Sequence, residues 1–269
     1  MTDTANLATY TAANRAAWDA SAPIHAAGDG WATLRTKFAI PGYSVLDKTL
    51  TDTFNSLNPK GKRVVQIGCN NGRELLSMPA FGAIAALGID QSAAFLAQAT
   101  QLAQIANQIC PFLCADIYDL PKDIPRNHDI ALITIGVLNW MPDLPRFFAT
   151  VASLLVPGGT LVIYETHPIL EMFDPEGQTP FTPATSYFAT TPVALQHAIT
   201  YDGSDAGAAP TSYWFIHTLG QIITACAASG LTIARLTEHP HSNREVEYDK
   251  YEDQSAQLPL SYTLIARKP

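Results

Sequence analysis

The chain has 269 residues, enough for one large α/β domain or two small ones, and its 47% apolar content excludes wholesale disorder. Its 24 acidic and 16 basic side chains give a net charge of −8, which repels phosphate backbones and argues against a nucleic-acid partner. No apolar run could span a bilayer, and residues 1–10 lack the features of a secretion signal. We therefore expect a cytoplasmic protein with no membrane partner.

The first 60 residues are predicted to form a helical segment, here called the prelude. An Ala-rich stretch around Asn14 and Trp18 is compatible with a helix, which we expect Pro23 and the glycines after it to interrupt. Apolar residues from Val45 to Leu57 follow helical spacing and predict a second amphipathic helix.

Strands and helices then alternate, which indicates a parallel, doubly wound, Rossmann-like sheet with right-handed crossovers. Strands are predicted at residues 63–67, 83–89, 112–116, 129–135 and 160–165, and two late strands at 231–236 and 262–266. Helices are predicted from near Arg73, from Ser92 as a helix cap, over 143–155, and from Leu219 to Gly230.

Residues 167–214 break this alternation because six prolines fall within them. The stretch is too long for a plain connection, so we interpret it as an insertion over the active site. Residues 61–269 are thus expected to form one domain that carries this insertion and is preceded by the prelude. The later stretch from Arg244 to Gln254 is rich in acids and is predicted to be a solvated loop.

The four cysteines do not have the spacing of a metal site. Cys69, Cys110, Cys114 and Cys226 include no CxxC pair, and no nearby histidine completes a zinc set. We expect reduced thiols that pack as small apolar groups, and no metal.

A glycine turn follows the first strand of the predicted sheet, in residues 64–72. Gly68 and Gly72 allow tight turning and bring backbone N–H groups close to a ligand at the carboxyl edge of the sheet. A dinucleotide-binding motif would have glycine in place of Asn70. The turn therefore predicts a nucleotide site but counts against a dinucleotide.

Acidic residues end the second and third predicted strands. Asp90 lies 22 positions after Gly68, where a carboxylate can accept hydrogen bonds from both ribose hydroxyls, although it could instead cap a helix. Asp116 could accept from an adenine amino group beside an apolar wall at Ile117, or be an ordinary turn residue.

Five motifs in this order resemble the class I S-adenosylmethionine-dependent methyltransferases of the small-molecule type. They are Val64–Gly72, Gly88–Asp90, Ala115–Ile117, Asp129–Trp140 and Leu155–Leu161. The resemblance covers residues 63–165 and 216–268. It implies a seven-stranded sheet of order 3-2-1-4-5-7-6 with an antiparallel last strand. It also implies that S-adenosylmethionine, released as S-adenosylhomocysteine, is surrounded by Gln66, Gly68, Cys69, Asn70, Gly72, Asp90, Gln91, Asp116, Ile117, Gly136, Val137 and Leu138.

Two positions depart from the family's pattern. The family often has Asp or Glu at the position of Gln66 and Gly at that of Asn70. An uncharged Gln66 leaves less negative charge for the ammonium group of the cofactor. We therefore expect the backbone carbonyls of Gly68 and Gly136 to contribute more there.

Histidine and aromatic residues are the candidates for the acceptor side. His167 follows the fifth strand and His217 begins a helix, so each is a candidate general base or a structural histidine. Candidate substrate-binding residues are Trp18, His25, Trp140, Tyr213 and Trp214. A subgroup of the family shares an early Asn, Trp and His pattern and a late Trp-x-x-His, which here correspond to Asn14, Trp18, His25, Trp214 and His217.

The sequence thus predicts methyl transfer from S-adenosylmethionine to an O, N or C atom of a small organic acceptor. Two alternatives stay open: a nicotinamide-dependent oxidoreductase, and a module that binds S-adenosylmethionine without catalysis. A homodimer is also left open.

Overall fold

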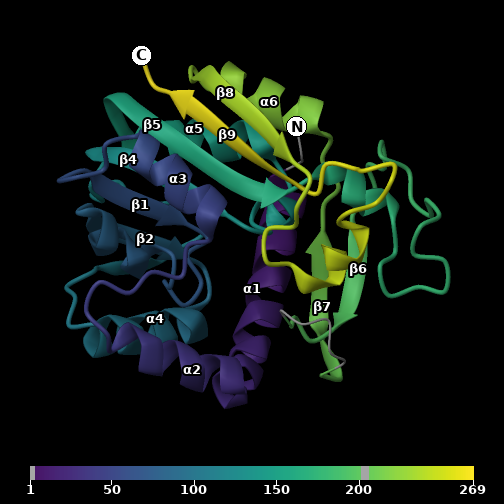
Figure 1. The fold of residues 1–269 in the computed structure, drawn as a ribbon, viewed down its shortest axis with the longest axis horizontal. Coiled ribbons are helices and arrows are strands. Elements are labelled where there is room, and N and C mark those ends of the chain that lie inside the picture. The colour runs from purple at the N-terminus through teal and green to yellow at the C-terminus, as the bar shows by residue number, and fades with distance from the viewer. Residues whose placement is uncertain (1–3, 201–205) are drawn as a thin grey trace.

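The computed structural model describes residues 4–200 and 206–269, and its centre is a seven-stranded sheet (Figure 1). Residues 1–3 of the prelude and 201–205 of the predicted insertion lie outside this description. The strands are β1 (Arg63–Ile67), β2 (Ile84–Asp90), β3 (Phe112–Cys114), β4 (His128–Thr134), β5 (Leu155–Thr166), β8 (Thr232–His239) and β9 (Ser261–Arg267).

The strand order is β3-β2-β1-β4-β5-β9-β8, with β9 antiparallel to both of its neighbours. Since β8 and β9 are the sixth and seventh strands of this sheet, the predicted order 3-2-1-4-5-7-6 is confirmed. The remaining pairs are parallel, so the carboxyl ends of β1, β2, β3 and β4 meet at one edge.

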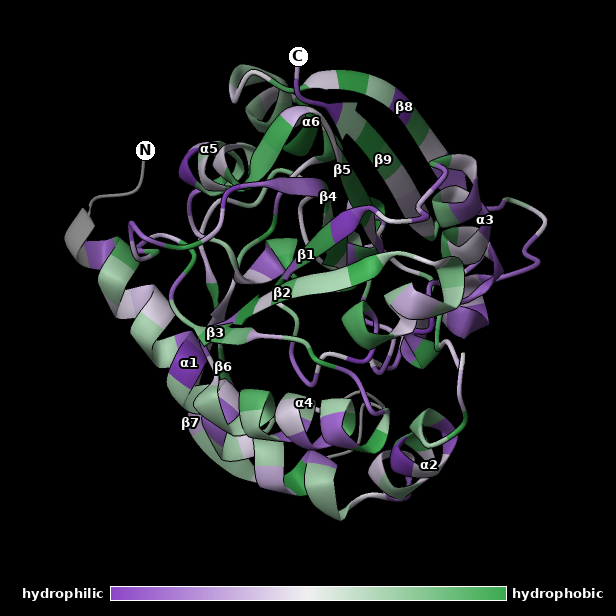
Figure 2. Ribbon diagram, turned by 90° about the vertical axis from the view of Figure 1, so that its left-hand side faces the viewer, coloured by the Kyte–Doolittle hydropathy of each residue, from purple (hydrophilic) through white to green (hydrophobic). Residues whose placement is uncertain are grey.

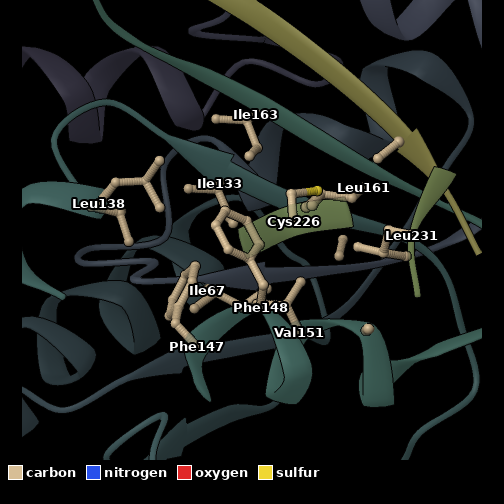
Figure 3. Close-up of a cluster of buried hydrophobic side chains, with 14 of the residues drawn as sticks. Ile67, Ile133, Leu138, Phe147, Phe148, Val151, Leu161, Ile163, Cys226 and Leu231 are labelled. Carbon is tan, nitrogen blue, oxygen red and sulfur yellow. The ribbon is translucent and has the colours of Figure 1, made fainter. Parts of the chain in front are cut away.

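Helices cover both faces of the sheet, and each face has its own apolar core. One face packs against α5 (Leu144–Leu154) and α6 (Leu219–Ala228). Figure 3 shows Phe147, Phe148 and Val151 of α5 lying beside Ile67 and Ile133 of β1 and β4. The other face packs against α3 (Lys48–Ser56) and the short 3₁₀ helix η1 (Leu75–Phe81).

The surface helices differ from the sheet in hydropathy. Figure 2 shows β5 and β9 mainly in the colours of apolar residues, whereas α1 and α4 carry polar and apolar residues along their length. The helix α4 (Ala93–Ile105) begins as predicted, because the Ser92 hydroxyl accepts a hydrogen bond from the Phe95 backbone N–H at 3.2 Å.

The helix expected from near Arg73 is wrong. After the glycine turn the chain forms η1, which contains Pro79 and ends at Gly82 in the left-handed region. Pro79 has no N–H to donate, and seven residues are too few to establish an α-helix against that loss. No long helix N-terminus therefore follows the turn.

The prelude forms α1 (Thr4–Ala27), α2 (Asp29–Phe38) and α3. Pro23 was expected to interrupt the first helix, but α1 continues through it. Tertiary hydrogen bonds hold this turn of α1, because Gln98 donates to the Ala22 carbonyl at 2.8 Å and the Ile199 N–H donates to the Ser21 hydroxyl at 3.0 Å. These contacts offset the usual cost of an interior proline.

The predicted insertion contains the 3₁₀ helix η3 (Pro168–Met172) and a two-stranded antiparallel sheet of β6 (Val193–His197) and β7 (Ala208–Trp214). Helix α1 lies alongside β7, between the small sheet and the large one (Figure 1). We call α1 and the described part of residues 167–214 the cap. In residues 4–200 and 206–269, no helix combines the length and the apolarity needed to cross a membrane.

Candidate active site

A partly open cleft lies at the carboxyl ends of the central strands. The register pairs Ile67 of β1 with Ile89 of β2 and with Ile133 of β4, so the residues that follow these three share one edge. The cleft contains about 970 Å³ of space between atoms, part of which is open to solvent. Parallel α/β sheets bind their ligands at this edge.

The turn after β1 has the backbone conformation that its sequence suggested. Gly68 has a φ of +63°, and a Cβ added there would lie 2.8 Å from a methyl carbon of Val137. Asn70 has a φ of +50°, in the left-handed region that asparagine tolerates better than most residues. Asparagine can therefore replace the family's glycine at this position without changing the turn.

Asp90 faces the cleft and holds two loops together. Its Oδ2 accepts a hydrogen bond from the Asn70 backbone N–H, and its Oδ1 accepts one from the Ser92 N–H, each at 2.8 Å. Each oxygen keeps a further lone pair that a ribose hydroxyl could use. Burial raises the pKa of Asp90, opposed by these hydrogen bonds. Gln91 lines the cleft beside it, and the helix cap is Ser92 rather than Asp90.

Asp116 and Ile117 also line the cleft, after β3. The Asp116 Oδ1 accepts a hydrogen bond from the Tyr118 N–H at 2.9 Å, so this aspartate closes a turn and still faces the cleft. Ile117 is buried and supplies the apolar wall that was expected beside it.

Glu165 of β5 shapes the loop after β4, a role that the sequence did not suggest. Its carboxylate accepts hydrogen bonds from the backbone N–H groups of Gly136, Val137 at 2.9 Å and Leu138 at 3.3 Å. Burial raises the pKa of Glu165 to about 8, although these donors favour its ionised form. Gly136 and Val137 line the cleft as a result.

Two residues expected around the cofactor lie elsewhere. The side chain of Leu138 is 2% exposed and belongs to the apolar core (Figure 3), because the Glu165 contacts turn its backbone and not its side chain to the loop. Gly72 has a φ of +73° and packs against the Phe112 ring, so it serves the turn rather than the cleft. Neither residue is in the cleft lining, and their contact with the cofactor stays a prediction.

Gln66 lies at the floor of the cleft beside Thr134. Its amide Nε2 donates to the Thr134 hydroxyl at 3.0 Å, and its Oε1 has no hydrogen-bond partner among the described residues. The side chain is 1% exposed. A buried, unsatisfied acceptor is costly, so its position in a cleft wall indicates a place for a ligand donor.

Aromatic side chains from the prelude and from η2 (Leu138–Trp140) form another wall. The rings of Trp18 and Trp140 meet edge to face with their centroids 5.4 Å apart, and both line the cleft. Met141, Tyr118 and Thr11 lie in the same lining. Trp18 and Trp140 therefore lie where the predicted substrate wall was expected.

Asn14, His25 and Trp214 mainly join segments of the cap to one another. Asn14 is fully buried, and its amide donates to the carbonyls of Tyr213 and Trp140 at 3.1 and 3.4 Å while its Oδ1 accepts from the Tyr213 N–H at 2.7 Å. Trp214 donates its indole N–H to Glu171 at 2.8 Å, and the His25 ring contacts the Ile199 carbonyl at 2.8 Å.

His25, Tyr213 and Trp214 are not among the residues that line the cleft, and their role in binding substrate stays a prediction. Their polar groups form hydrogen bonds within the cap, between segments that are distant in sequence. Buried polar groups there need such partners.

Both candidate bases lie outside the cleft lining as well. His167 accepts a hydrogen bond from the Ile169 N–H at its Nδ1, so its Nε2 carries the proton and donates to Glu238 at 3.0 Å. The Nε2 of His217 donates to the Met141 carbonyl at 2.9 Å. Burial lowers the pKa of both imidazoles. Both rings thus make structural contacts, and a role for either as a general base stays a prediction.

Charged residues missed by the sequence analysis lie at the same cleft: Arg73, Glu74 and Glu245. Arg73 and Glu74 directly follow the glycine turn, a position that could have suggested them. Glu245 has no local signal, because the stretch 244–254 was predicted to be a solvated loop. That prediction is wrong, since this stretch includes the 3₁₀ helix η4 (Val246–Tyr251), and Tyr251 is 2% exposed.

All four cysteines are free thiols, and Cys69 and Cys226 are buried. Cys69 lines the cleft, where burial raises its pKa well above the ordinary value and keeps it neutral. Over the described parts of the chain, no three His, Cys, Asp or Glu side chains form a group that could hold a metal ion.

Comparison with known proteins agrees with this geometry. Residues 65–163 match the model of a family described as a methyltransferase domain. This part of the chain is therefore similar to a methyltransferase domain. The match begins in β1 and ends in β5, and so contains the glycine turn, Asp90, Asp116 and the loop after β4.

Similar proteins share the domain but differ in what their names describe. A trans-aconitate 2-methyltransferase from Deinococcus radiodurans is 32% identical over 38% of this chain and 36% of its own length. A tRNA U34 carboxymethyltransferase from Hydrogenovibrio crunogenus is 32% identical over 39% of this chain and 32% of its own. The matches thus span less than half of these curated relatives.

The similarity to solved structures extends further along the chain. An S-adenosylmethionine-dependent methyltransferase from Mesorhizobium loti has a TM-score of 0.54 at 20% identity. The similarity covers 81% of this chain and 96% of that one, so the two share a fold well beyond the matched domain.

Proposed function

We propose that the protein transfers the methyl group of S-adenosylmethionine to an O, N or C atom of a small organic acceptor. The observation that carries this proposal is the single cleft that joins Asp90, Asp116 and Gln66 along one sheet edge. We assign the ribose to Asp90, the adenine to Asp116 and Ile117, and the amino-acid part to the end of the cleft at Gln66 and Gly136.

The residues present fit one adenosine joined to an amino acid better than two linked nucleotides. A pyrophosphate needs glycines that allow close approach and the N-terminus of a helix. Here the side chain of Asn70 occupies the second glycine position, and the next helical element is the short η1 from Leu75. These features favour the methyltransferase over the nicotinamide-dependent alternative.

When bound, S-adenosylmethionine supplies a methyl group already activated by its sulfonium. The acceptor atom forms a bond to the methyl carbon, the carbon–sulfur bond breaks, and its electron pair stays on sulfur. What the chain must supply is alignment and a dry cleft, and orientation of this kind contributes up to about 7–11 kcal/mol. Trp18, Trp140 and the buried floor at Gln66 are suited to that task.

The cleft lining favours a flat acceptor with little negative charge. Its aromatic wall at Trp18 and Trp140 can stack on a flat molecule. Among the described residues of the lining, Arg73 is the one lysine or arginine, and it already pairs with Glu74 at 2.9 Å. A nucleic acid or a polyanionic acid would need more positive charge than this lining offers.

Calorimetric titration with S-adenosylhomocysteine tests the cofactor, and fluorescence titration with NADH tests the alternative. We expect S-adenosylhomocysteine to bind at micromolar concentrations and NADH to bind at least tenfold more weakly. No binding of S-adenosylhomocysteine at hundreds of micromolar would contradict the proposal. Mass spectrometry of a panel of flat acceptors incubated with S-adenosylmethionine then separates a transferase from a module that binds without catalysis.

A further inference from the structure

Four charged side chains, Arg73, Glu74, Arg244 and Glu245, gather at the cleft, and all but Arg244 line it. Glu74 accepts hydrogen bonds from Arg73 at 2.9 Å and from Arg244 at 3.1 Å. Burial alone would raise the pKa of Glu74, but the two arginines hold it below its ordinary value. Glu74 is thus ionised, and the two arginines balance its negative charge. Glu245 is the second carboxylate of the group.

Glu245 differs from the other carboxylates of the cleft in its contacts. Asp90, Asp116 and Glu74 each accept hydrogen bonds from the protein, whereas the Glu245 carboxylate accepts none from the described residues. It is close enough to Glu165, which holds the Gly136 loop, to raise the pKa of that group.

Gln66 is the second, independent observation at the cleft. Its buried Oε1 has no hydrogen-bond partner among the described residues, so it can accept a hydrogen bond from a ligand. The amide carries no charge, however, and an ammonium group leaves water only at a high cost unless a charged acceptor replaces it.

We propose that Glu245 supplies the negative charge that Gln66 lacks, so that its carboxylate and the Gln66 amide oxygen bind the ammonium group of the cofactor. This inference rests on the proposed function, because it assigns one end of the S-adenosylmethionine site. The negative charge that the family often carries at the position of Gln66, on β1, would here come from Glu245, on the connection between β8 and β9.

That connection is held firmly enough to position a ligand group. The buried Asn243 accepts a hydrogen bond from the Thr166 hydroxyl at 3.1 Å, and the Ser261 hydroxyl donates to the His241 carbonyl at 2.8 Å. Arg244 donates to the Val45 carbonyl at 3.3 Å as well as to Glu74. Glu245 is thus flanked by residues tied to β5, β9 and the prelude, which reduces the entropy lost on binding.

The test compares two ligands that differ only in the ammonium group. S-adenosylhomocysteine and its deamino analogue, in which hydrogen replaces the amino group, are titrated by calorimetry into the wild-type protein and Glu245→Gln. Glu247→Gln is the matched control, because Glu247 lies on the same segment but outside the cleft lining; the titrations are made at pH 8.5, since Glu247 raises the pKa of Glu245. Thermal melting checks that each variant is folded.

We expect the wild type to prefer S-adenosylhomocysteine over the deamino analogue by at least tenfold, and Glu245→Gln to lose most of this preference. Glu247→Gln should keep it. Adding Gln66→Glu to Glu245→Gln should restore part of it, because the charge returns to the first strand. A wild-type preference that Glu245→Gln leaves unchanged would overturn this inference alone, whereas failure of both ligands to bind the wild type would overturn the proposed function.

If Glu245→Gln does not fold, Glu245→Asp provides the measurement. It keeps the charge but withdraws it by one methylene, so the preference should fall while the affinity for the deamino analogue stays within twofold. An unchanged preference in that variant would also overturn the inference.

Discussion

The edge of the sheet and the cap use buried polar groups in different ways. At the edge, Asp90 and Glu165 accept backbone N–H groups from turns nearby and so shape a cleft. In the cap, Asn14 and Glu171 join segments that are far apart in the sequence. The comparison teaches that a buried polar side chain in this chain can either shape a ligand site or connect distant segments. Its hydrogen-bond partners decide between the two roles.

Glu171 illustrates the second case. Its two oxygens accept hydrogen bonds from the Trp214 indole at 2.8 Å and from the Asn139 amide at 3.1 Å. Burial raises its pKa to about 7, a value that would suit a general base. It is nevertheless absent from the described cleft lining. The raised pKa of Glu171 therefore belongs to a residue that connects two segments by hydrogen bonds.

The largest expected effect concerns the edge. Asp90→Ala removes the acceptor of two backbone N–H groups and of the proposed ribose contact, and should weaken S-adenosylhomocysteine binding by about 100-fold, or about 2.7 kcal/mol. Asp129→Ala is the control, because Asp129 accepts from the Arg63 N–H at 2.8 Å at the opposite ends of β1 and β4. Calorimetry should show less than a twofold change for it. Equal effects of the two variants would reject the assignment of Asp90.

The second effect concerns the cap. Asn14→Ala leaves the buried Tyr213 N–H without its partner and should lower the free energy of unfolding by about 2 kcal/mol. Urea denaturation measures this loss, with Asn55→Ala on the exposed face of α3 as a control that should stay within about 0.5 kcal/mol. An unchanged stability of Asn14→Ala would show that the cap is held in another way.

The smallest expected effect is a pH dependence of S-adenosylhomocysteine affinity, which tests Glu245 and neither the sheet edge around Asp90 nor the cap. Burial and Glu247 raise the pKa of Glu245 to about 7, opposed by Arg73 and Arg244, while Glu74 also raises it. Because an ammonium ligand needs the ionised carboxylate, the free protein must release a proton on binding below pH 7. Affinity for S-adenosylhomocysteine should therefore fall by up to about tenfold per pH unit below 7 and level off above it.

Calorimetry between pH 6 and 8 measures this slope in the wild type and in Glu245→Gln. The variant should show a flatter profile, since it has no carboxyl proton to release at that position. The same slope in both proteins would assign the pH dependence to another group.

How far the sequence could predict the molecule depends on the distance over which each interaction acts. The positions of Gly68, Asp90 and Asp116 depend on residues next to their own strands, and the structure places all three in the cleft lining. The sheet order was implied by the family resemblance, and the structure confirms it. The placement of His167 and His217 depended on contacts with Glu238 and Met141, which no local pattern reveals.

The sequence by itself determined the alternation of strands and helices, and with it the edge at which a nucleotide-like ligand would bind, because hydrophobic period and turn residues act within a few positions. The tertiary structure alone decided that α1 continues through Pro23, that Asn14 joins the cap, and that Glu245 reaches the cleft from the last connection of the sheet. The physical reason is that a buried polar group must find its partner in space, and the chain brings that partner from wherever the fold places it.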